Sequence, residues 1–363
     1  MTHPRIAVIY LSFHCEPYMP MVLPAMEAIT YPQDRIEWII VDNPHPVHGS
    51  SVAYLRNEVL PKSGVTLPTV TLIENTENLG FAGGNNVGVE YAIKNGFDYV
   101  FFLNNDAYPA PDAFEHLAAA MESDPKIGIA QSLIMLHQDK NKINTAGNAI
   151  HYLGFGYCDA YKNVFSKDAY EPVTDIGYAS GAAMMVRAST IQDLGAWDND
   201  FFLYHEDMEW SLRVRVLRAM RVVLVRDSVF YHAYDFSRSI TKYYWMERNR
   251  FAVWLMYLRP WTWVLIFPMI LAMEIGQFVF AIARGWWREK LKVYVYWSKP
   301  AHWRLWLAKR RRIQRERTMS DAELSKIFVT KILFQESVVE SPVLKYIANP
   351  MMTAYWNIIK HLV

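Results

Sequence analysis

The chain has 363 residues, enough for one large domain with an appendage or for two small domains. Hydrophobic residues make up 52% of it and aromatic residues 15%, a composition that excludes an intrinsically disordered chain. The formal net charge is only +1, but residues 284–317 hold twelve Lys or Arg and two Glu, a local charge of +10. This uneven distribution predicts a polyanionic partner, either a lipid surface or nucleic acid.

The two cysteines, Cys15 and Cys158, lie far apart in the sequence. Two distant thiols form neither a disulfide framework nor a cysteine metal site, so they favour a reducing compartment. The N-terminal apolar run is short and has no basic leader. We therefore expect no signal peptide and interpret this run as a first buried strand.

Apolar, β-branched runs in the first third of the chain predict buried strands. They alternate with helix-like stretches such as 85–95, which favours an α/β fold with a mostly parallel sheet flanked by helices. Ligands of such folds bind outside the carboxyl ends of the strands. Ser12, Asp42 and the residues 104–106 follow three of these runs and are expected on one edge of the sheet. The predicted strands are 6–11, 36–41, 70–74 and 99–103.

The remaining elements are less regular until the chain changes character near Tyr243. A helix is expected to end at Ser123, because Asp124-Pro125 follows it. We then expect loops with irregular strands over 137–177, a helix from about 206 to 219, and strands at 222–225 and 228–232. The predicted domains are a catalytic domain over 1–242, with a nucleotide-binding half of about 1–110 and an acceptor half of about 111–242, and a helical region over 243–363.

Asp106 follows the apolar run that ends at Leu103, so a carboxylate is expected at the end of a strand. An oxygen ligand there suits a hard divalent cation, which would neutralise a diphosphate. His232 also follows a strand-like run, and its imidazole would complete such a site for Mg²⁺ or Mn²⁺. The alternatives are an Asx turn at Asp106 and a structural histidine at His232.

The stretch 78–86 is rich in Gly and Asn and precedes a predicted helix. Gly83 and Gly84 permit a close approach of the backbone, and the N-terminus of a helix attracts anions. A phosphate or a sugar hydroxyl is therefore expected there. The alternative is a tight connection between a strand and a helix, because the stretch matches neither GxGxxG nor a P-loop.

Three acidic residues, Glu206, Asp207 and Glu209, follow an aromatic segment at the start of a predicted helix. Complementing the helix dipole explains one acid in such a place, but it explains three poorly. A carboxylate at this position is a candidate general base that deprotonates an acceptor hydroxyl. The neighbouring His205 is interpreted as a packing or capping residue.

In this order, these stretches resemble the family-two inverting glycosyltransferases of the GT-A fold. The similarity is closest to the rhamnosyltransferase-like branch and covers roughly residues 5–255. Each stretch alone is a weak signal, and their joint occurrence is specific. The matching stretches are 78–86, 103–106, 180–187 and 201–207.

The resemblance implies a role for each candidate residue. Asp207 would be the general base, oriented by Glu206, and Asp106 with His232 would bind Mg²⁺ or Mn²⁺. Two departures affect the site: Pro44-His45 replaces the family's usual Gly-Ser after Asp42-Asn43, and Asn104 and Asn105 leave Asp106 as almost the sole carboxylate of the metal motif. The expected donor-binding residues are Ser12, Asp42, Asn78, Gly83, Asn86, Asn105, Asp106, Ser180 and Gly181.

The implied activity is a single displacement that moves a sugar from a nucleotide diphosphate to a lipid-linked or polysaccharide acceptor in cell-surface glycan synthesis. By resemblance the donor is dTDP-rhamnose or a UDP-sugar. One alternative is an inactive nucleotide-sugar-binding scaffold of a glycan assembly complex. A Rossmann oxidoreductase would need GxGxxG after the first strand, where Ser12-Phe13-His14-Cys15 stands. A nucleic-acid binder using 304–317 would leave the N-terminal motifs unused, so no nucleic-acid partner is expected.

The segment from Trp261 to Ala283 is almost uninterrupted apolar sequence of about the length that spans a bilayer. Glu274 near its centre is costly in hydrocarbon, and Pro268 would kink a spanning helix. Flanking aromatic and basic residues favour a helix that lies in the interface at the cytoplasmic face of the cell membrane. The alternatives are a spanning helix, a buried hairpin, and an aromatic interface of a homo-oligomer.

Overall fold

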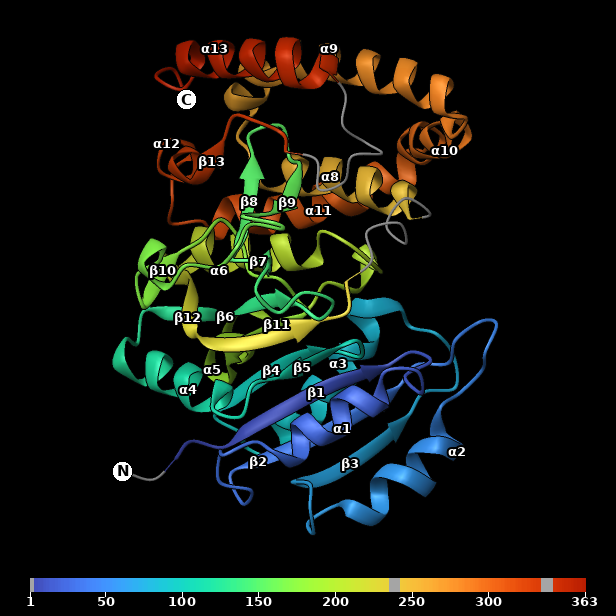
Figure 1. Cartoon of the computed structure of the whole chain (residues 1–363). Coiled ribbons are helices and arrows are strands. Elements are labelled where there is room, and N and C mark those ends of the chain that lie inside the picture. The colour runs from blue at the N-terminus through green and yellow to red at the C-terminus, as the bar shows by residue number, and fades with distance from the viewer. Residues whose placement is uncertain (1–2, 235–241, 334–341) are drawn as a thin grey trace. The chain divides into compact units, whose positions relative to one another are not determined.

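The computed structural model describes residues 3–234, 242–333 and 342–363, and divides the chain into two compact units (Figure 1). The first unit comprises Met1–Asn148, Cys158–Val214 and Met220–Tyr234, and the second comprises Ala149–Tyr157, Arg215–Ala219 and Asp235–Val363. The predicted catalytic domain ended at 242, and its last stretch, 235–241, lies outside the described residues.

The first unit is built on a mixed sheet that has ten strands among the described residues. Its parallel part is β3 (Thr69–Glu74), β2 (Ile36–Asp42), β1 (Ile6–Ser12) and β4 (Tyr99–Asn104), in that spatial order. Ile6 pairs with Ile36 on one side and Tyr99 on the other, so the carboxyl ends of these strands share one edge. The α/β fold expected from the alternating apolar runs is confirmed.

The second part of the sheet mixes strand directions, unlike the mostly parallel sheet expected. β11 (Ala183–Arg187) runs antiparallel between β4 and β6 (Ile127–Leu136). β6 lies parallel to β12 (Arg221–His232). The short strands β5 (Ala107–Pro109) and β10 (Val173–Asp175) pair with β12, and β7 (Ile143–Thr145) pairs with β6.

The two strands predicted at 222–225 and 228–232 are one strand, β12, with a shift in register between Val225 and Val229. The prediction was wrong because two charged residues interrupt the apolar pattern there. Arg226 donates to the carbonyl of Tyr170 and pairs with Asp227. The irregular register accommodates both charges without ending the strand.

Helices cover the sheet of the first unit. Helix α3 begins at Gly80, five residues before the predicted start at Asn85. Its glycines allow the helix to pack closely on β1: a Cβ on Gly84 would lie 2.5 Å from Leu11 Cδ1, and one on Gly88 would lie 2.7 Å from Ile9 Cγ2. The helices with bounds are α1 (Met19–Glu27), α2 (Val52–Tyr54), α3 (Gly80–Lys94), α4 (Ala113–Ser123), α5 (Ala188–Leu194) and α6 (Glu206–Arg218), which begins in this unit.

The second unit is mainly helical, as expected. Its helices are α8 (Tyr243–Tyr257), α9 (Pro260–Arg284), α10 (Trp287–Trp297), α11 (Pro300–Glu316), α12 (Asp321–Leu324) and α13 (Asn349–Ile359). A small sheet of β13 (Phe328–Val329), β8 (Asn148–His151) and β9 (Gly156–Cys158) accompanies them. Among the described residues, α9 is the one helix that is long and apolar enough to cross a membrane.

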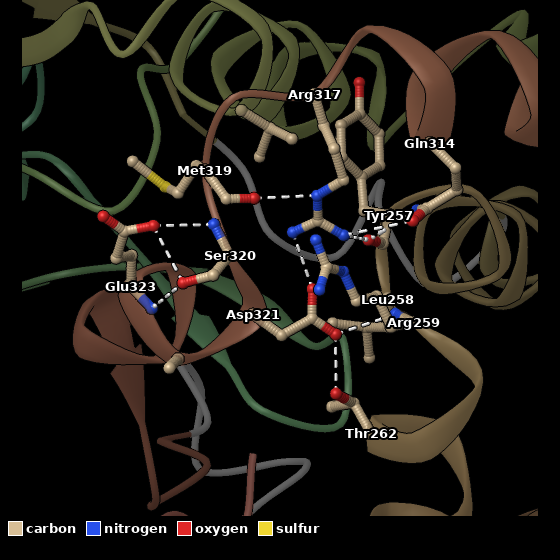
Figure 2. A network of polar contacts seen from close by, with 12 residues as sticks. Tyr257, Leu258, Arg259, Thr262, Gln314, Arg317, Met319, Ser320, Asp321 and Glu323 are labelled. Carbon is tan, nitrogen blue, oxygen red and sulfur yellow. Dashed lines mark hydrogen bonds and ion pairs between the residues drawn. The ribbon is translucent and has the colours of Figure 1, made fainter.

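A buried network around Asp321 ties helices of the second unit together (Figure 2). The Asp321 carboxylate pairs with the Arg317 guanidinium at 2.7 Å and accepts hydrogen bonds from Arg259 N at 2.7 Å and Thr262 Oγ1 at 2.6 Å. Arg317 also donates to the carbonyl of Tyr257. One carboxylate thereby fixes the start of α9 against the start of α12.

A second buried network joins α8, α9 and α10 through two acids and two bases. Arg250 and Lys290 each pair with both Glu247 and Glu274. Burial raises the pKa of Glu247, but the adjacent Arg250 and Lys290 outweigh burial and hold this pKa well below its usual range. Glu274, which the sequence marks as an isolated charge in an apolar helix, is therefore neutralised within the protein.

Candidate active site

Asp106 and His232 are adjacent because β5 pairs with β12. The register places Ala107 opposite His232, and Ala233 N donates to Asp106 O at 2.9 Å. The His232 Nε2 atom and the Asp106 Oδ1 atom are 3.0 Å apart. Strand pairing thus brings together the two metal ligands that the sequence predicted 126 residues apart.

Asn144, at the centre of β7, contacts the other ring nitrogen of His232. Its Oδ1 lies 2.9 Å from His232 Nδ1, and its Nδ2 is buried without a hydrogen-bond partner. If Nδ1 carries the proton, Nε2 faces Asp106 with a lone pair, and two facing acceptors require a cation or a proton between them. Rotating the amide by half a turn gives Nδ2 an acceptor and moves the ring proton to Nε2.

The Asp106–His232 pair fits one side of a divalent cation site. Neighbouring ligands of an octahedral ion at about 2.1 Å are about 3 Å apart, which is the separation observed between Nε2 and Oδ1. With the proton on Nδ1, the contact with Asn144 Oδ1 is the outer support that metal-binding histidines use. Within the described residues no group of three or more His, Cys, Asp or Glu is placed to hold a metal. The pair therefore suits Mg²⁺ or Mn²⁺ shared with a diphosphate and water.

Asp207 lies at the first turn of α6 and is partly buried. Its Oδ1 accepts from Met208 N at 2.8 Å and its Oδ2 from Gly181 N at 3.4 Å. Burial raises the pKa of Asp207 to about 6, against the lowering effect of these backbone hydrogen bonds. A carboxylate with such a pKa accepts a proton near neutral pH, as a general base must.

The segment 180–182 links Asp207 to the edge of the sheet that carries Asp106. Ala183 pairs with Leu103 at the end of β4, and Asn104 N donates to Ala182 O at 3.1 Å. Two residues earlier, Ser180 N donates to Gln131 Oε1 at 2.7 Å. The start of β11 thus lies beside the end of β4. The hydrogen bond from Gly181 N to Asp207 therefore places Asp207 at the same edge of the sheet as Asn104–Asp106.

The backbone before α6 is strained at three non-glycine residues. Phe202, Tyr204 and His205 have φ angles of 61°, 66° and 66°. Left-handed backbone at bulky residues costs free energy and tends to occur at functional sites. The conformation of Phe202 directs its carbonyl to the start of α3, where it accepts from Phe81 N at 2.8 Å and Ala82 N at 3.4 Å.

Several polar groups at the start of α3, where a phosphate or a sugar hydroxyl was predicted, make contacts within the protein. The N–H groups of Phe81 and Ala82 already donate to Phe202. Asn78 Oδ1 accepts from Asn43 Nδ2 and Gly80 N, and Asn86 Nδ2 donates to Trp197 O and Asn199 Oδ1. Gly83 lies inside the helix. Asn78, Gly83 and Asn86 therefore have structural contacts, and their donor contacts stay predictions.

Asp42 and Ser12 are buried at the ends of β2 and β1. Asp42 Oδ1 accepts from Ser12 Oγ at 3.0 Å and from Ser51 N at 3.1 Å, and Oδ2 accepts from Ser50 Oγ at 2.6 Å. The carboxylate therefore shapes the loop 43–51, in which Pro44-His45 departs from the family pattern. A nucleotide placed here would contact the loop before it reaches the 1% exposed Asp42.

The other candidates have contacts within the protein. Asn105 Nδ2 donates to Phe13 O at 2.9 Å, and its donor contact stays a prediction. Glu206 is buried at the start of α6, and its predicted role in orienting Asp207 stays a prediction. Glu209 forms an ion pair with Arg213 one turn away.

The contacts of Asn144, Gln131 and Phe202 were not predicted from the sequence. Asn144 lies in a stretch rich in Asn and Gly that reads as loop, and Gln131 is a polar residue inside an apolar strand. A fully buried glutamine in a strand is itself a signal, since buried polar side chains need partners. The positive φ of Phe202 has no sequence signature, because bulky residues rarely adopt it.

The mixed sheet, its flanking helices and the site at the carboxyl ends of β1, β2 and β4 define a GT-A fold. The profile of "Glycosyl transferase family group 2" matches residues 99–309, more than half of the chain. The chain therefore belongs to this family of glycosyltransferases. A search of curated proteins gives no match.

Two solved structures share the fold. The crystal structure of GalNAc-T7 with UDP, GalNAc and Mn²⁺ superposes with a TM-score of 0.54 at 12% identity, over 73% of this chain and 50% of that chain. This chain thus spans about half the length of the GalNAc-T7 chain. The structure of S. aureus TarS 1–349 superposes with a TM-score of 0.50 at 15% identity, over 98% of this chain and 90% of that chain.

Proposed function

We propose that the protein is an inverting, metal-dependent glycosyltransferase in which Asp207 is the general base. The observation that carries this proposal is the position of Asp207, whose raised pKa suits proton transfer, on the same edge as the Asp106–His232 pair. The link through Gly181 and Ala182 joins the two groups along a short stretch of backbone. A single displacement needs one general base for the acceptor and one group of residues that binds the diphosphate of the donor.

In the proposed reaction, an Asp207 oxygen takes the proton of the acceptor hydroxyl while the hydroxyl oxygen attacks the anomeric carbon of the donor. The bond from that carbon to the diphosphate oxygen breaks, and the nucleoside diphosphate leaves with the electron pair. A single displacement inverts the anomeric configuration. Asp207 keeps the proton until the product departs, which its pKa of about 6 permits.

Asp106 and His232 would hold the divalent cation, with Asn144 fixing the orientation of the imidazole. When bound, Mg²⁺ or Mn²⁺ supplies positive charge next to the departing diphosphate. The protein orients this charge through β5 and β12, whose pairing fixes the separation of the two ligands.

The donor and acceptor are proposed from resemblance. GalNAc-T7 was crystallised with UDP, GalNAc and Mn²⁺, which supports a nucleotide-sugar donor and a divalent cation. We place a UDP-sugar or dTDP-rhamnose at the donor site, the latter from the likeness to the rhamnosyltransferase-like branch. The proposed acceptor is a lipid-linked or polysaccharide glycan at the cytoplasmic face of the cell membrane.

The test is a panel of UDP-, dTDP- and GDP-sugars measured for binding and for hydrolysis with Mn²⁺, with Mg²⁺ and with EDTA. We expect one donor class to bind, its hydrolysis to need the cation, and EDTA to abolish it. Turnover that persists in EDTA would contradict the role of Asp106 and His232. Binding without turnover, even with membranes added as acceptor, would favour the inactive scaffold.

A further inference from the structure

Helix α9 carries a stripe of exposed, large apolar side chains. Seven of them are 49–61% exposed and lie at spacings of three or four residues. At 100° per residue they fall within about 120° of the helix circumference. A contiguous apolar stripe of this size on a folded protein marks an interaction surface. Its members are Trp261, Val264, Phe267, Leu271, Ile275, Val279 and Ile282.

Helix α13 lies beside α9 and extends this apolar surface. Tyr355 Oη donates to Leu265 O at 2.6 Å, and Trp261 Nε1 donates to Leu362 O at 3.0 Å. The two helices lie along one edge of the second unit (Figure 1). Met352 and Trp356 anchor α13 in the interior, while Met351, Ile358 and Leu362 are exposed.

The part of α9 that contacts α8 and α10, next to the stripe, is unsuited to lipid. Glu274 is only 14% exposed and contacts Arg250 at 2.5 Å and Lys290 at 2.8 Å, and Lys290 itself is fully buried. Tyr294 Oη donates to Glu274 at 3.0 Å. If α9 crossed a bilayer, this ion cluster on α8 and α10 would be carried to hydrocarbon depth. A helix in the plane of the interface keeps the cluster inside the protein and the stripe in lipid.

Basic side chains flank the stripe at both ends. At the N-terminal end, Arg259 and Arg311 are exposed and line a cavity of about 560 Å³ together with Arg310 and the apolar Pro260 and Leu307. Arg310 is held by the carbonyls of Leu255 and Leu258. Guanidinium groups beside apolar side chains complement a phospholipid, which has a headgroup phosphate next to apolar acyl chains. At the C-terminal end, Arg284 and Arg288 are exposed.

We propose that α9 and α13 lie flat in the surface of an anionic phospholipid bilayer, with Arg259 and Arg311 contacting headgroup phosphates. The occupant is a lipid surface because the apolar stripe is bordered by positive charge at both ends, which complements anionic headgroups. This proposal deepens the proposed function and rests on it in one respect, because a membrane-borne acceptor would be the reason for the enzyme to bind lipid. It does not depend on the identity of the donor.

The first test uses the full chain and co-sedimentation with vesicles of phosphatidylcholine, alone or mixed with phosphatidylglycerol. We expect binding to both, tighter to the anionic vesicles. Phe267→Glu with Ile275→Glu should weaken binding at least ~10-fold, because charged side chains are costly in lipid. The matched control is Val65→Glu with Val164→Glu, which changes two exposed apolar residues of the first unit and should leave binding unchanged.

A second pair of variants tests the arginine cavity. Arg259→Gln with Arg311→Gln should remove most of the preference for anionic vesicles, while Arg304→Gln with Arg315→Gln, exposed on the same helix α11, should reduce it less. Equal losses from both pairs would overturn the role of the cavity. Vesicle binding that survives alkaline carbonate would overturn the in-plane position in favour of a spanning helix.

Two further readouts separate this proposal from its rivals. A dimer in lipid-free buffer that Phe267→Glu with Ile275→Glu dissociates would show that a second copy covers the stripe, and would overturn the proposal. Nucleotide-sugar binding is measured on every variant without vesicles. If neither the wild type nor any variant binds a donor, but vesicle binding follows the pattern above, the proposed function is wrong and the proposal of a membrane-binding surface is supported.

Discussion

The position of Asp207 at the start of α6 determines the pKa of its carboxyl group. Two backbone N–H groups hold its carboxylate, yet burial dominates and raises its pKa to about 6. Since a base acts only when deprotonated, kcat/KM should rise about tenfold per pH unit below pH 6 and level off above it. A rate profile from pH 4.5 to 8 checks this, and a profile that is flat through pH 6 would exclude Asp207 as the base.

The same pKa shift predicts a cost in stability. The folded pKa exceeds the unfolded one, so the charged carboxylate destabilises the fold above pH 6, and this cost vanishes below the unfolded pKa near 4. Asp207→Asn should therefore raise the free energy of unfolding by about 1–3 kcal/mol at pH 8 and change it little at pH 3.5. Thermal denaturation of both proteins at the two pH values measures this. Asp34→Asn, at an exposed position, is the control.

Asn144 would support the imidazole of His232 without touching the proposed metal ion. Its Oδ1 lies 2.9 Å from His232 Nδ1, so its loss frees the ring to rotate and change tautomer. Asn144→Leu should lower Mn²⁺ affinity about 10–100-fold in a calorimetric titration with nucleoside diphosphate present. Asn141→Leu, at an exposed position nearby, should leave the affinity unchanged. Equal affinities in the wild type and Asn144→Leu would remove Asn144 from the site.

Some residues of the candidate site could be predicted from the sequence and others could not. Asp106, His232 and Asp207 were predicted because each follows a recognisable run, and the structure places them on one edge of the sheet. Asn144 was missed because its role depends on the pairing of β7 with β6. Contacts made across strands distant in sequence leave no local pattern to detect.

At the scale of elements, Gly80 joins helix α3 to the strained segment before α6. Its φ is 74°, and a Cβ there would lie 2.5 Å from Phe202 Cδ2 and 2.7 Å from Phe202 O. The glycine-rich stretch 78–86 predicted a site for a phosphate or a sugar hydroxyl, which stays a prediction, and in the structure its glycines allow helix α3 to pack closely. Glycine has low helix propensity, so the sequence placed the start of α3 too late.

A pair of glycine variants separates strain from crowding. Gly96 has a φ of 68° and open space around its Cβ direction, so Gly96→Ala should cost only the strain of about 1–2 kcal/mol. Gly80→Ala adds a clash with Phe202 and should cost a further ~1–3 kcal/mol. Urea denaturation compares the two. Equal losses of stability in the two variants would mean that Phe202 moves away from the added methyl group without a cost in free energy.

At the scale of the whole molecule, the helical unit depends on buried charge pairs. Lys290 balances Glu247 and Glu274, so Lys290→Met should leave an uncompensated buried charge and cost about 3–5 kcal/mol. Lys292→Met removes an exposed pair with Glu289 on the same helix and should cost less than about 0.5 kcal/mol. Denaturation that finds the two variants alike would show that the cluster adds no stability.

Sequence patterns indicated the classes of both units but not their limits. Alternating apolar runs predicted the α/β unit, and the apolar segment 261–283 predicted α9 within one residue at each end. The stretches 149–157 and 215–219 belong to the second unit, although the chain enters them from the first. Composition alone did not reveal that Glu274 is paired, because its partners lie on other helices.

The role of Asp207 as general base is tested by transfer of label from the identified nucleotide sugar to a membrane fraction, by wild type and by Asp207→Asn. We expect Asp207→Asn to bind donor and metal like the wild type and to transfer sugar about 10²–10⁴-fold more slowly. Transfer by Asp207→Asn at the rate of the wild type would contradict it, because no proton acceptor would remain at the position that defines the proposed mechanism.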